Sequence, residues 1–117
     1  MSRLRAPQQH DVLFAAVSHL PHVLAFALVD YIASQSNAEQ LFDFAASGFR
    51  DYTRIAGSSP EMWRDICLAN RDALLQQIGG YEQELARIKA LIAAGDGAEL
   101  AELFGRARDA RQGYLKS

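Results

Sequence analysis

The sequence has few of the residues that build disulfide scaffolds, metal clusters or nucleic-acid surfaces. Its 117 residues include one cysteine, three histidines and three prolines, with 12 lysines and arginines against 14 aspartates and glutamates. Because Cys67 is the single cysteine, an internal disulfide is excluded, which fits a reducing compartment such as the cytoplasm. With a net charge of −2 the sequence has no excess of basic residues, so we expect no nucleic-acid partner.

Uninterrupted apolar runs are also short. Apolar residues dominate from Val12 to Ala33, but Ser18 and two histidines interrupt them, and the longest unbroken run is Val23–Val29. A membrane-spanning helix needs about 18 or more consecutive apolar residues. We therefore predict a buried core helix here, rather than a membrane span, and no membrane partner.

The remaining pattern predicts an all-α fold of one domain, since no stretch favours a strand. Residues 1–9 are polar and are interpreted as an arm or linker, followed by the domain itself over 10–117. One long central helix, or two helices end to end, is expected over 10–34. A kink is expected near Val17–Leu20, because Pro21 lacks the N–H that bonds the preceding turn. Asn37 is expected to cap a short helix that ends near Phe44.

The second half predicts an antiparallel helical hairpin. One long helix is expected from Pro60 to about Ala94, ended by Gly95, and a last helix capped by Asp96. Each of these two helices carries apolar residues at alternating steps of three and four. Such a stripe of apolar side chains packs against a partner helix. Gly79-Gly80 lies inside the first of these helices, so a bend or break is expected there.

Between these parts lies a short segment with two arginines around one aspartate. Arg50, Asp51 and Arg54 are spaced to meet on one helix surface. The cluster is either a solvated face or a carboxylate clamp, in which Asp51 holds one arginine while the other reaches a ligand. Gly57 is expected to end this helix in a left-handed cap, and Ser59 to cap the next helix.

The histidines leave a metal site open as an alternative. His19 and His22 are three apart and share a helix face, and His10-Asp11 is a pair found in metal-dependent phosphohydrolases. A third convincing ligand near the first pair is absent, so satisfied structural histidines are the other interpretation, and we predict no metal.

Four stretches together resemble the C-terminal domain of the prephenate dehydrogenase family, from about residue 10 to the C-terminus. They are H-D at 10–11, S-H-L-P-H-V-L-A-F-A-L-V at 18–29, G-F-R-D-Y-T-R-I-A at 48–56 and S-P-E-M-W-R-D-I at 59–66. This family includes the arogenate and cyclohexadienyl dehydrogenases of tyrosine biosynthesis. The resemblance implies a homodimeric oxidoreductase that converts prephenate to 4-hydroxyphenylpyruvate with NAD or NADP, with tyrosine as a candidate inhibitor.

The resemblance also implies a substrate site. Arg54 matches the arginine that binds a substrate carboxylate, and His22 matches the histidine near the substrate side chain. Trp63 matches a tryptophan that lines the pocket. Ser47 and Gly48 are implied to contact the substrate, but Ala46-Ser47-Gly48 stands where many members carry a run of glycines. Ser47 is therefore expected to narrow this loop or change its polarity.

Three more residues are implied to form an ionic network around that site. Asp51 matches an aspartate beside the substrate-binding arginine, and Arg50 lies where the family has a basic residue. Asp11 matches an acidic residue that reaches the site of the neighbouring subunit.

The resemblance implies that the cofactor is bound elsewhere. In the family a Rossmann domain precedes this region, and no G-x-G-x-x-G turn or strand–helix alternation is found in this sequence. We therefore expect an excised domain that is inactive alone. The alternatives are a stand-alone helical interaction module that binds tyrosine-like ligands, and the metal-dependent hydrolase described above.

Overall fold

The computed structural model describes residues 7–116, and these residues contain helices and turns but no strand. The all-α prediction is confirmed. The described elements are α1 (Pro7–Phe14), the π-helical segment η1 (Ala15–His19), α2 (Leu20–Ala33), α3 (Ala38–Asp43), α4 (Ser47–Thr53), the 3-10 turn η2 (Arg54–Gly57), α5 (Pro60–Ala69), α6 (Arg71–Ala94) and α7 (Gly97–Lys116). The chain forms two compact units, which divide inside α6 between Ile78 and Gly79.

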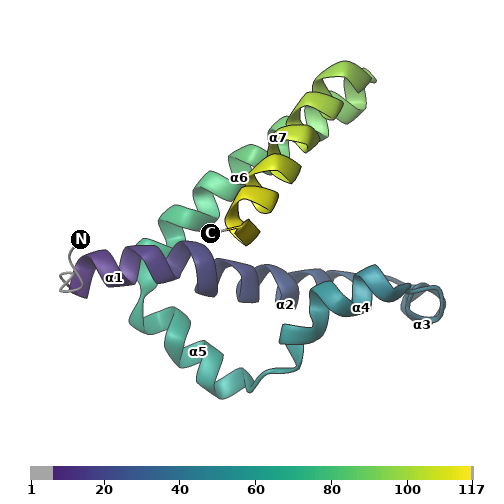
Figure 1. Ribbon diagram of the computed structural model, residues 1–117. Coiled ribbons are helices and arrows are strands. Elements are labelled where there is room, and N and C mark those ends of the chain that lie inside the picture. Colours follow the sequence, from purple (N-terminus) through teal and green to yellow (C-terminus); the bar gives the residue numbers. More distant parts are fainter. Residues whose placement is uncertain (1–6, 117) are drawn as a thin grey trace. The chain divides into compact units, whose positions relative to one another are not determined.

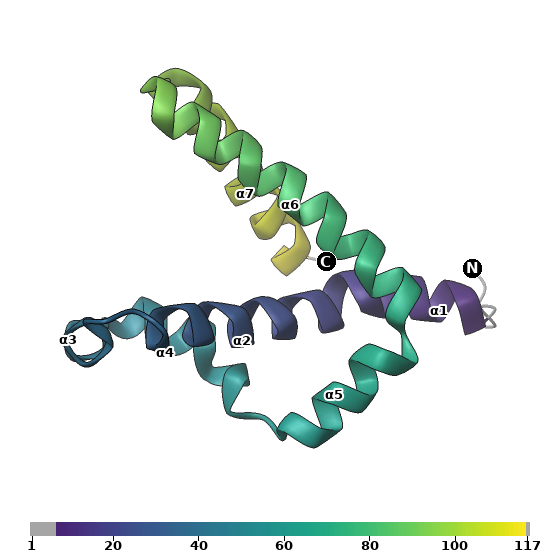
Figure 2. The same cartoon turned by 180° about the vertical axis from the view of Figure 1, so that it is seen from behind.

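The first unit is built along a rod in which α1, η1 and α2 follow one another end to end (Figures 1 and 2). The expected kink before Pro21 takes the form of the π-helical segment, in which the backbone N–H of Leu20 donates to the carbonyl of Ala15. Proline cannot donate to the preceding turn, and the wider π turn accommodates that missing bond.

The rod is much less buried than the sequence suggested. The helical stretch Gln9–Ala33 is long and apolar enough to cross a membrane by length and composition alone. Its 18-residue apolar window has a mean hydropathy of 2.0, yet only 11% of that window is buried. Ala15 and Ala25 are fully buried, whereas Val17 is 74% exposed. The prediction of an enclosed core helix is therefore wrong for a single chain, because the elements that return along α2 are short and cover only part of it.

Those returning elements are α3, α4 and η2, each of which packs against α2. The predicted left-handed cap at Gly57 is wrong, since the described residue with positive φ is Gly95. Instead α4 tightens into η2, and the Ser58 hydroxyl donates to the carbonyl of Ile55 at 2.8 Å. A side chain thereby closes a helix end for which the sequence suggested glycine.

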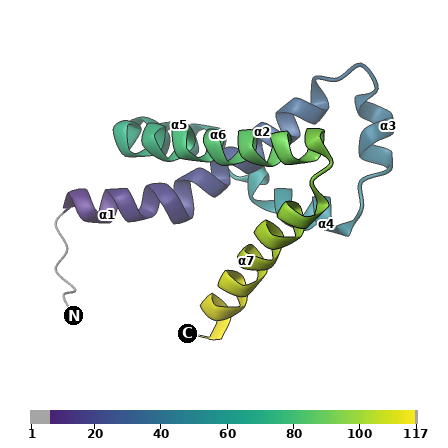
Figure 3. The same ribbon diagram turned by 90° about the horizontal axis from the view of Figure 1, so that it is seen from above.

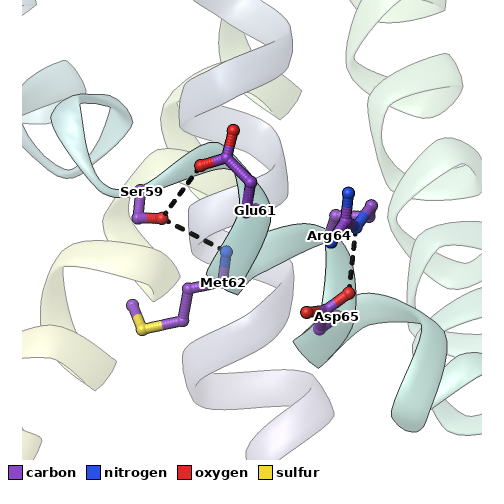
Figure 4. Close-up of polar contacts among 5 residues, drawn as sticks. All are labelled: Ser59, Glu61, Met62, Arg64 and Asp65. Atoms are coloured by element: carbon purple, nitrogen blue, oxygen red, sulfur yellow. Dashed lines mark hydrogen bonds and ion pairs between the residues drawn. The ribbon is translucent and has the colours of Figure 1, made fainter.

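The start of α5 follows the prediction for Ser59. The Ser59 hydroxyl oxygen accepts the backbone N–H of Met62 at 3.2 Å, and its own O–H faces Glu61 at 3.4 Å (Figure 4). This is the expected N-cap geometry ahead of Pro60 at the first helical position.

The single helix predicted over 60–94 is in fact two helices, α5 and α6. Asn70 separates them with φ −118° and ψ 39°, outside the helical region. Its side chain bonds residues of α1 and η1, so a tertiary contact overrides the helical pattern. No break occurs at Gly79-Gly80, because α6 continues through both glycines.

The hairpin turn between α6 and α7 confirms two predicted signals. Gly95 has φ +67°, and the N–H of Asp96 donates to the carbonyl of Leu91, which is the Schellman arrangement. The Asp96 carboxylate then accepts the N–H of Glu99 at 3.1 Å and caps α7. The two helices diverge from the turn (Figure 3). The apolar residues that the sequence places at steps of three and four are therefore only partly covered, and Ile92 remains 62% exposed.

Candidate functional site

The centre of the first unit is a cluster of aromatic rings around Trp63 on α5. The His22 ring on α2 stacks on the indole with centroids 3.7 Å apart and planes 15° apart. The His19 ring meets the same indole edge-on at 6.0 Å. Phe14 in turn contacts His19 edge-on at 6.3 Å. The structure therefore brings two of the expected site residues, His22 and Trp63, into direct contact.

The His22 ring is held by a hydrogen bond to the turn before it. Its Nδ1 lies 2.8 Å from the carbonyl oxygen of Ser18. Because a carbonyl oxygen only accepts, Nδ1 carries the proton and donates. The neutral ring then has an unprotonated Nε2.

The His19 ring is held by a residue far away in the sequence. The side-chain Nδ2 of Asn70 lies 3.2 Å from His19 Nδ1 and 2.8 Å from the backbone carbonyl oxygen of Asp11. Partial burial lowers the pKa of His19, the nearby charge of His22 lowers it further, and Asp11 opposes both effects. His19 is therefore favoured in its neutral form.

An apolar groove shares Trp63 with this cluster. It has a volume of about 250 Å³ and is lined by Val23, Phe26, Pro60, Trp63, Arg64 and Cys67. Arg64 is one of these lining residues, and its Nε donates to the neighbouring Asp65 at 2.9 Å (Figure 4). Partial burial raises the pKa of the Cys67 thiol, so this cysteine is kept as a neutral, weakly polar group.

The arginine–aspartate cluster is present but does not form the expected clamp. Arg50 and Asp51 lie on α4 and Arg54 begins η2, and all three side chains are exposed. Among the described residues no ion pair joins them. The suggestion that Asp51 positions one arginine is thus not met in this chain, since i,i+3 spacing permits such a pair but does not require it. The Arg54 guanidinium remains available for an anion.

The remaining expected site residues lie on α4 and α1. Ser47 and Gly48 form the first turn of α4 rather than a loop, and both are exposed. A Cβ added at Gly48 would meet no atom within 4 Å, so the chain itself requires no glycine there. Asp11 lies on α1, with its carboxylate 4.0 Å from His10 and largely exposed.

The alternative metal site gains no support from the geometry of residues 7–116. In this part of the chain no three His, Cys, Asp or Glu side chains are placed to hold one ion. His19 Nδ1 is already occupied by Asn70, and His22 Nδ1 by a carbonyl.

Sequence reasoning missed Asn70 altogether and gave His19 no place in the substrate site. The S-H-L-P-H stretch marked both histidines, but their neighbours come from other elements. Asn70 sits in a stretch with helical spacing, and no local signal showed that its amide would reach residues 51 and 59 positions earlier.

Comparison with known proteins places these observations in one family. A sequence model described as "Prephenate dehydrogenase, dimerization domain" matches residues 6–106. The chain is 40% identical over 109 residues to a prephenate dehydrogenase of Bacillus subtilis, covering 92% of this chain and 29% of that protein. It is 36% identical over 110 residues to a cyclohexadienyl dehydrogenase of Zymomonas mobilis, covering 92% and 38%.

Solved structures agree with this. Prephenate dehydrogenase from A. aeolicus, in complex with hydroxyphenyl propionate and NAD+, superposes with a TM-score of 0.86 at 43% identity, covering 92% of this chain and 38% of that one. Arogenate dehydrogenase from Synechocystis gives 0.88 at 31% identity, covering 94% and 41%. The chain thus spans between about three and four tenths of the length of these relatives. By sequence and by fold, it belongs to the prephenate dehydrogenase family, as that family's helical dimerisation domain.

Proposed function

We propose that this chain is the substrate-binding and dimerisation part of a cytoplasmic, NAD(P)-dependent prephenate or arogenate dehydrogenase. The observation that carries the proposal is the match to the family's dimerisation domain over residues 6–106. It is supported by the likeness to the A. aeolicus enzyme, whose structure holds a phenol with a three-carbon carboxylate side chain and NAD+.

In this proposal the chain binds and orients the substrate. Arg54 binds a substrate carboxylate, since its planar guanidinium matches a carboxylate with two parallel hydrogen bonds and has no ion-pair partner among the described residues. Trp63 provides a flat apolar wall, fixed on one face by His22 at 3.7 Å. Tyrosine has a phenol ring and a carboxylate, as hydroxyphenyl propionate does, so tyrosine remains a candidate inhibitor that binds at the same place.

The described residues do not fit a dinucleotide. A dinucleotide site needs a strand followed by a glycine-rich turn and a helix, and residues 7–116 contain no strand. We therefore assign binding of NAD or NADP to a part of the full-length enzyme other than these residues. What this chain contributes is the pocket wall and the carboxylate contact.

The dimer in this proposal covers the exposed side of the α1–η1–α2 rod. Val12, Leu13, Phe14 and Val17 are large apolar side chains on that rod, and all four are exposed. Exposed apolar patches mark contact surfaces, and the family's dimerisation role favours a second copy of the chain over a membrane as the covering surface.

Arg54→Ala in the dehydrogenase that contains this chain tests the substrate role. Loss of a charge-assisted pair that leaves a carboxylate unpartnered costs about 2–4 kcal/mol, so kcat/KM is expected to fall by about 30- to 1,000-fold. Arg87→Ala is the matched control, because Arg87 pairs with Glu84 on the exposed surface of α6. Equal steady-state constants for Arg54→Ala and the wild-type enzyme would refute the assignment.

Light scattering of the chain tests the dimer. We expect twice 12.9 kDa for the wild-type chain and a shift toward 12.9 kDa for Val17→Asp, which places a charge in the proposed contact. Phe44→Asp is the control, since this side chain is exposed but lies beyond α3 and off the rod. A wild-type monomer, or a Val17→Asp variant that dimerises as well as the control, would argue against this surface.

A further inference from the structure

Asn70 makes the most informative long-range polar contact described in the first unit. It stands between α5 and α6, and its Nδ2 faces two acceptors at once, the Asp11 carbonyl oxygen at 2.8 Å and His19 Nδ1 at 3.2 Å. The contacts link the α5–α6 junction to α1 and η1. Neither partner lies within 50 residues of Asn70, so the contact exists only in the folded chain.

The positions of the hydrogens follow from the chemistry of these atoms. A carbonyl oxygen can only accept, so the side-chain atom that faces Asp11 must be the amide nitrogen and not the amide oxygen. An amide nitrogen has two protons and no lone pair to offer, so the second proton points to His19 Nδ1. That nitrogen must then be the acceptor, and the single proton of neutral His19 sits on Nε2.

The two histidines beside Trp63 therefore carry their protons on opposite nitrogens. His22 has its proton on Nδ1, where it donates to the Ser18 carbonyl, and a lone pair on Nε2. His19 has its lone pair on Nδ1 and its proton on Nε2. The free nitrogen of one ring is a donor, and the free nitrogen of the other is an acceptor.

We propose that Asn70 is a positioning residue that fixes His19 as the Nε2–H tautomer, so that the paired histidines at Trp63 offer a bound ligand one donor and one acceptor. A ligand group with both an acceptor and a donor, such as the carboxylate and ammonium of an amino acid or a hydroxyl, is complementary to this pair. The ligand part rests on the proposed function, whereas the tautomer part rests on the hydrogen bonds alone.

The charges around His19 agree with a neutral ring. His22 on α2 and Asp11 on α1 are the titratable groups that act on it, with opposite signs, and Asn70 contributes a neutral amide from the α5–α6 junction. Together with partial burial they place the pKa of His19 below its usual value of 6.5. A proton on Nδ1 would also face the amide N–H of Asn70, which further disfavours the charged ring.

NMR of the 15N-labelled chain at pH 7.5 tests the tautomer directly. We expect His19 to show a protonated Nε2 and an unprotonated Nδ1, with a scalar coupling between Nδ1 and the Asn70 amide nitrogen across the hydrogen bond. This readout needs no variant to fold. A His19 proton on Nδ1, or the absence of the coupling, would overturn the proposal.

Asn70→Asp reverses the hydrogen bond while keeping the size of the side chain. The carboxylate accepts from Nδ1–H, so the pKa of His19 should rise by about one unit or more and its tautomer should change. Asn37→Asp is the control, because Asn37 is exposed and makes no side-chain cap bond, and it should leave His19 unchanged. An unchanged His19 titration in a folded Asn70→Asp chain would contradict the role of Asn70.

Kinetics of the dehydrogenase that contains this chain test the ligand part. Asn70→Asp is expected to lower kcat/KM at least tenfold and to move the pH profile with the His19 titration, whereas a purely structural loss would leave the profile in place. If the wild-type enzyme does not act on prephenate or arogenate at all, the proposed function fails, while the NMR result still decides the role of Asn70.

Discussion

The stack of Trp63 on His22 gives the sharpest prediction for stability. Trp63 is partly buried, and a partly buried tryptophan removes about 150 Å² from water. At about 25 cal/mol/Å² this contributes about 4 kcal/mol, and a ring pair at 3.7 Å adds about 1 kcal/mol. In Trp63→Ala the surrounding side chains relax into part of the vacated space, which offsets part of the lost stabilisation. We therefore expect the free energy of unfolding to fall by about 3–5 kcal/mol.

Urea denaturation followed by circular dichroism measures this loss, at one fixed protein concentration because the proposed dimer makes unfolding depend on concentration. Trp63→Phe keeps a ring against His22 and should lose only about 1–2 kcal/mol. Met62→Ala is the matched control on the same helix, because Met62 is 52% exposed, and it should stay within about 0.5 kcal/mol of the wild type. A Trp63→Ala midpoint equal to that of the control would refute the energetic importance of the stack.

Three further predictions concern helix ends and pH. Ser59→Ala removes the acceptor for the first turn of α5 and should cost about 1 kcal/mol in urea denaturation, and a cost near zero would show that this cap is not needed. Gly95→Ala places a Cβ at φ +67° and should cost about 1 kcal/mol by the same assay, although no atom obstructs the Cβ; a stabilised variant would contradict this. Because the pKa of His19 is lowered on folding, the unfolded chain binds a proton more readily, so the free energy of unfolding should fall as the pH drops from 7.5 through 6.5 toward 5. His19→Gln should flatten that pH dependence, and an unchanged slope would show that other groups cause it.

The helix boundaries were the most predictable part of the fold. The Ser59 cap and the Gly95-Asp96 turn depend on atoms within a few residues, so their sequence signals were sufficient. Pro21 is likewise preceded by an irregular, π-helical turn. Because proline has no N–H, the hydrogen bond to the turn before it is missing, and this effect is local in the sequence. The wrong prediction at Gly57 shows the limit, since Ser58 closed that end with its own hydroxyl.

The candidate site was only partly predictable. Trp63 and His22 were identified from the family resemblance, and the structure brings their rings together, but their roles toward a substrate remain proposals. Arg54, Arg50 and Asp51 were expected to form a network, yet the described residues show no ion pair among them. Charge spacing on a helix permits a contact, whereas the exposed side chains gain little from making it.

What the sequence determined by itself was the all-α class, the ends of several helices and the family. These depend on local hydrogen bonds, on apolar periodicity and on four recognisable stretches. The tertiary structure decided the break at Asn70, the contacts of the Asn70 side chain with Asp11 and His19, and the exposure of the α1–η1–α2 rod. Each of these depends on which distant groups meet in space, and a pattern read along one chain carries no information about atoms that lie 50 residues away.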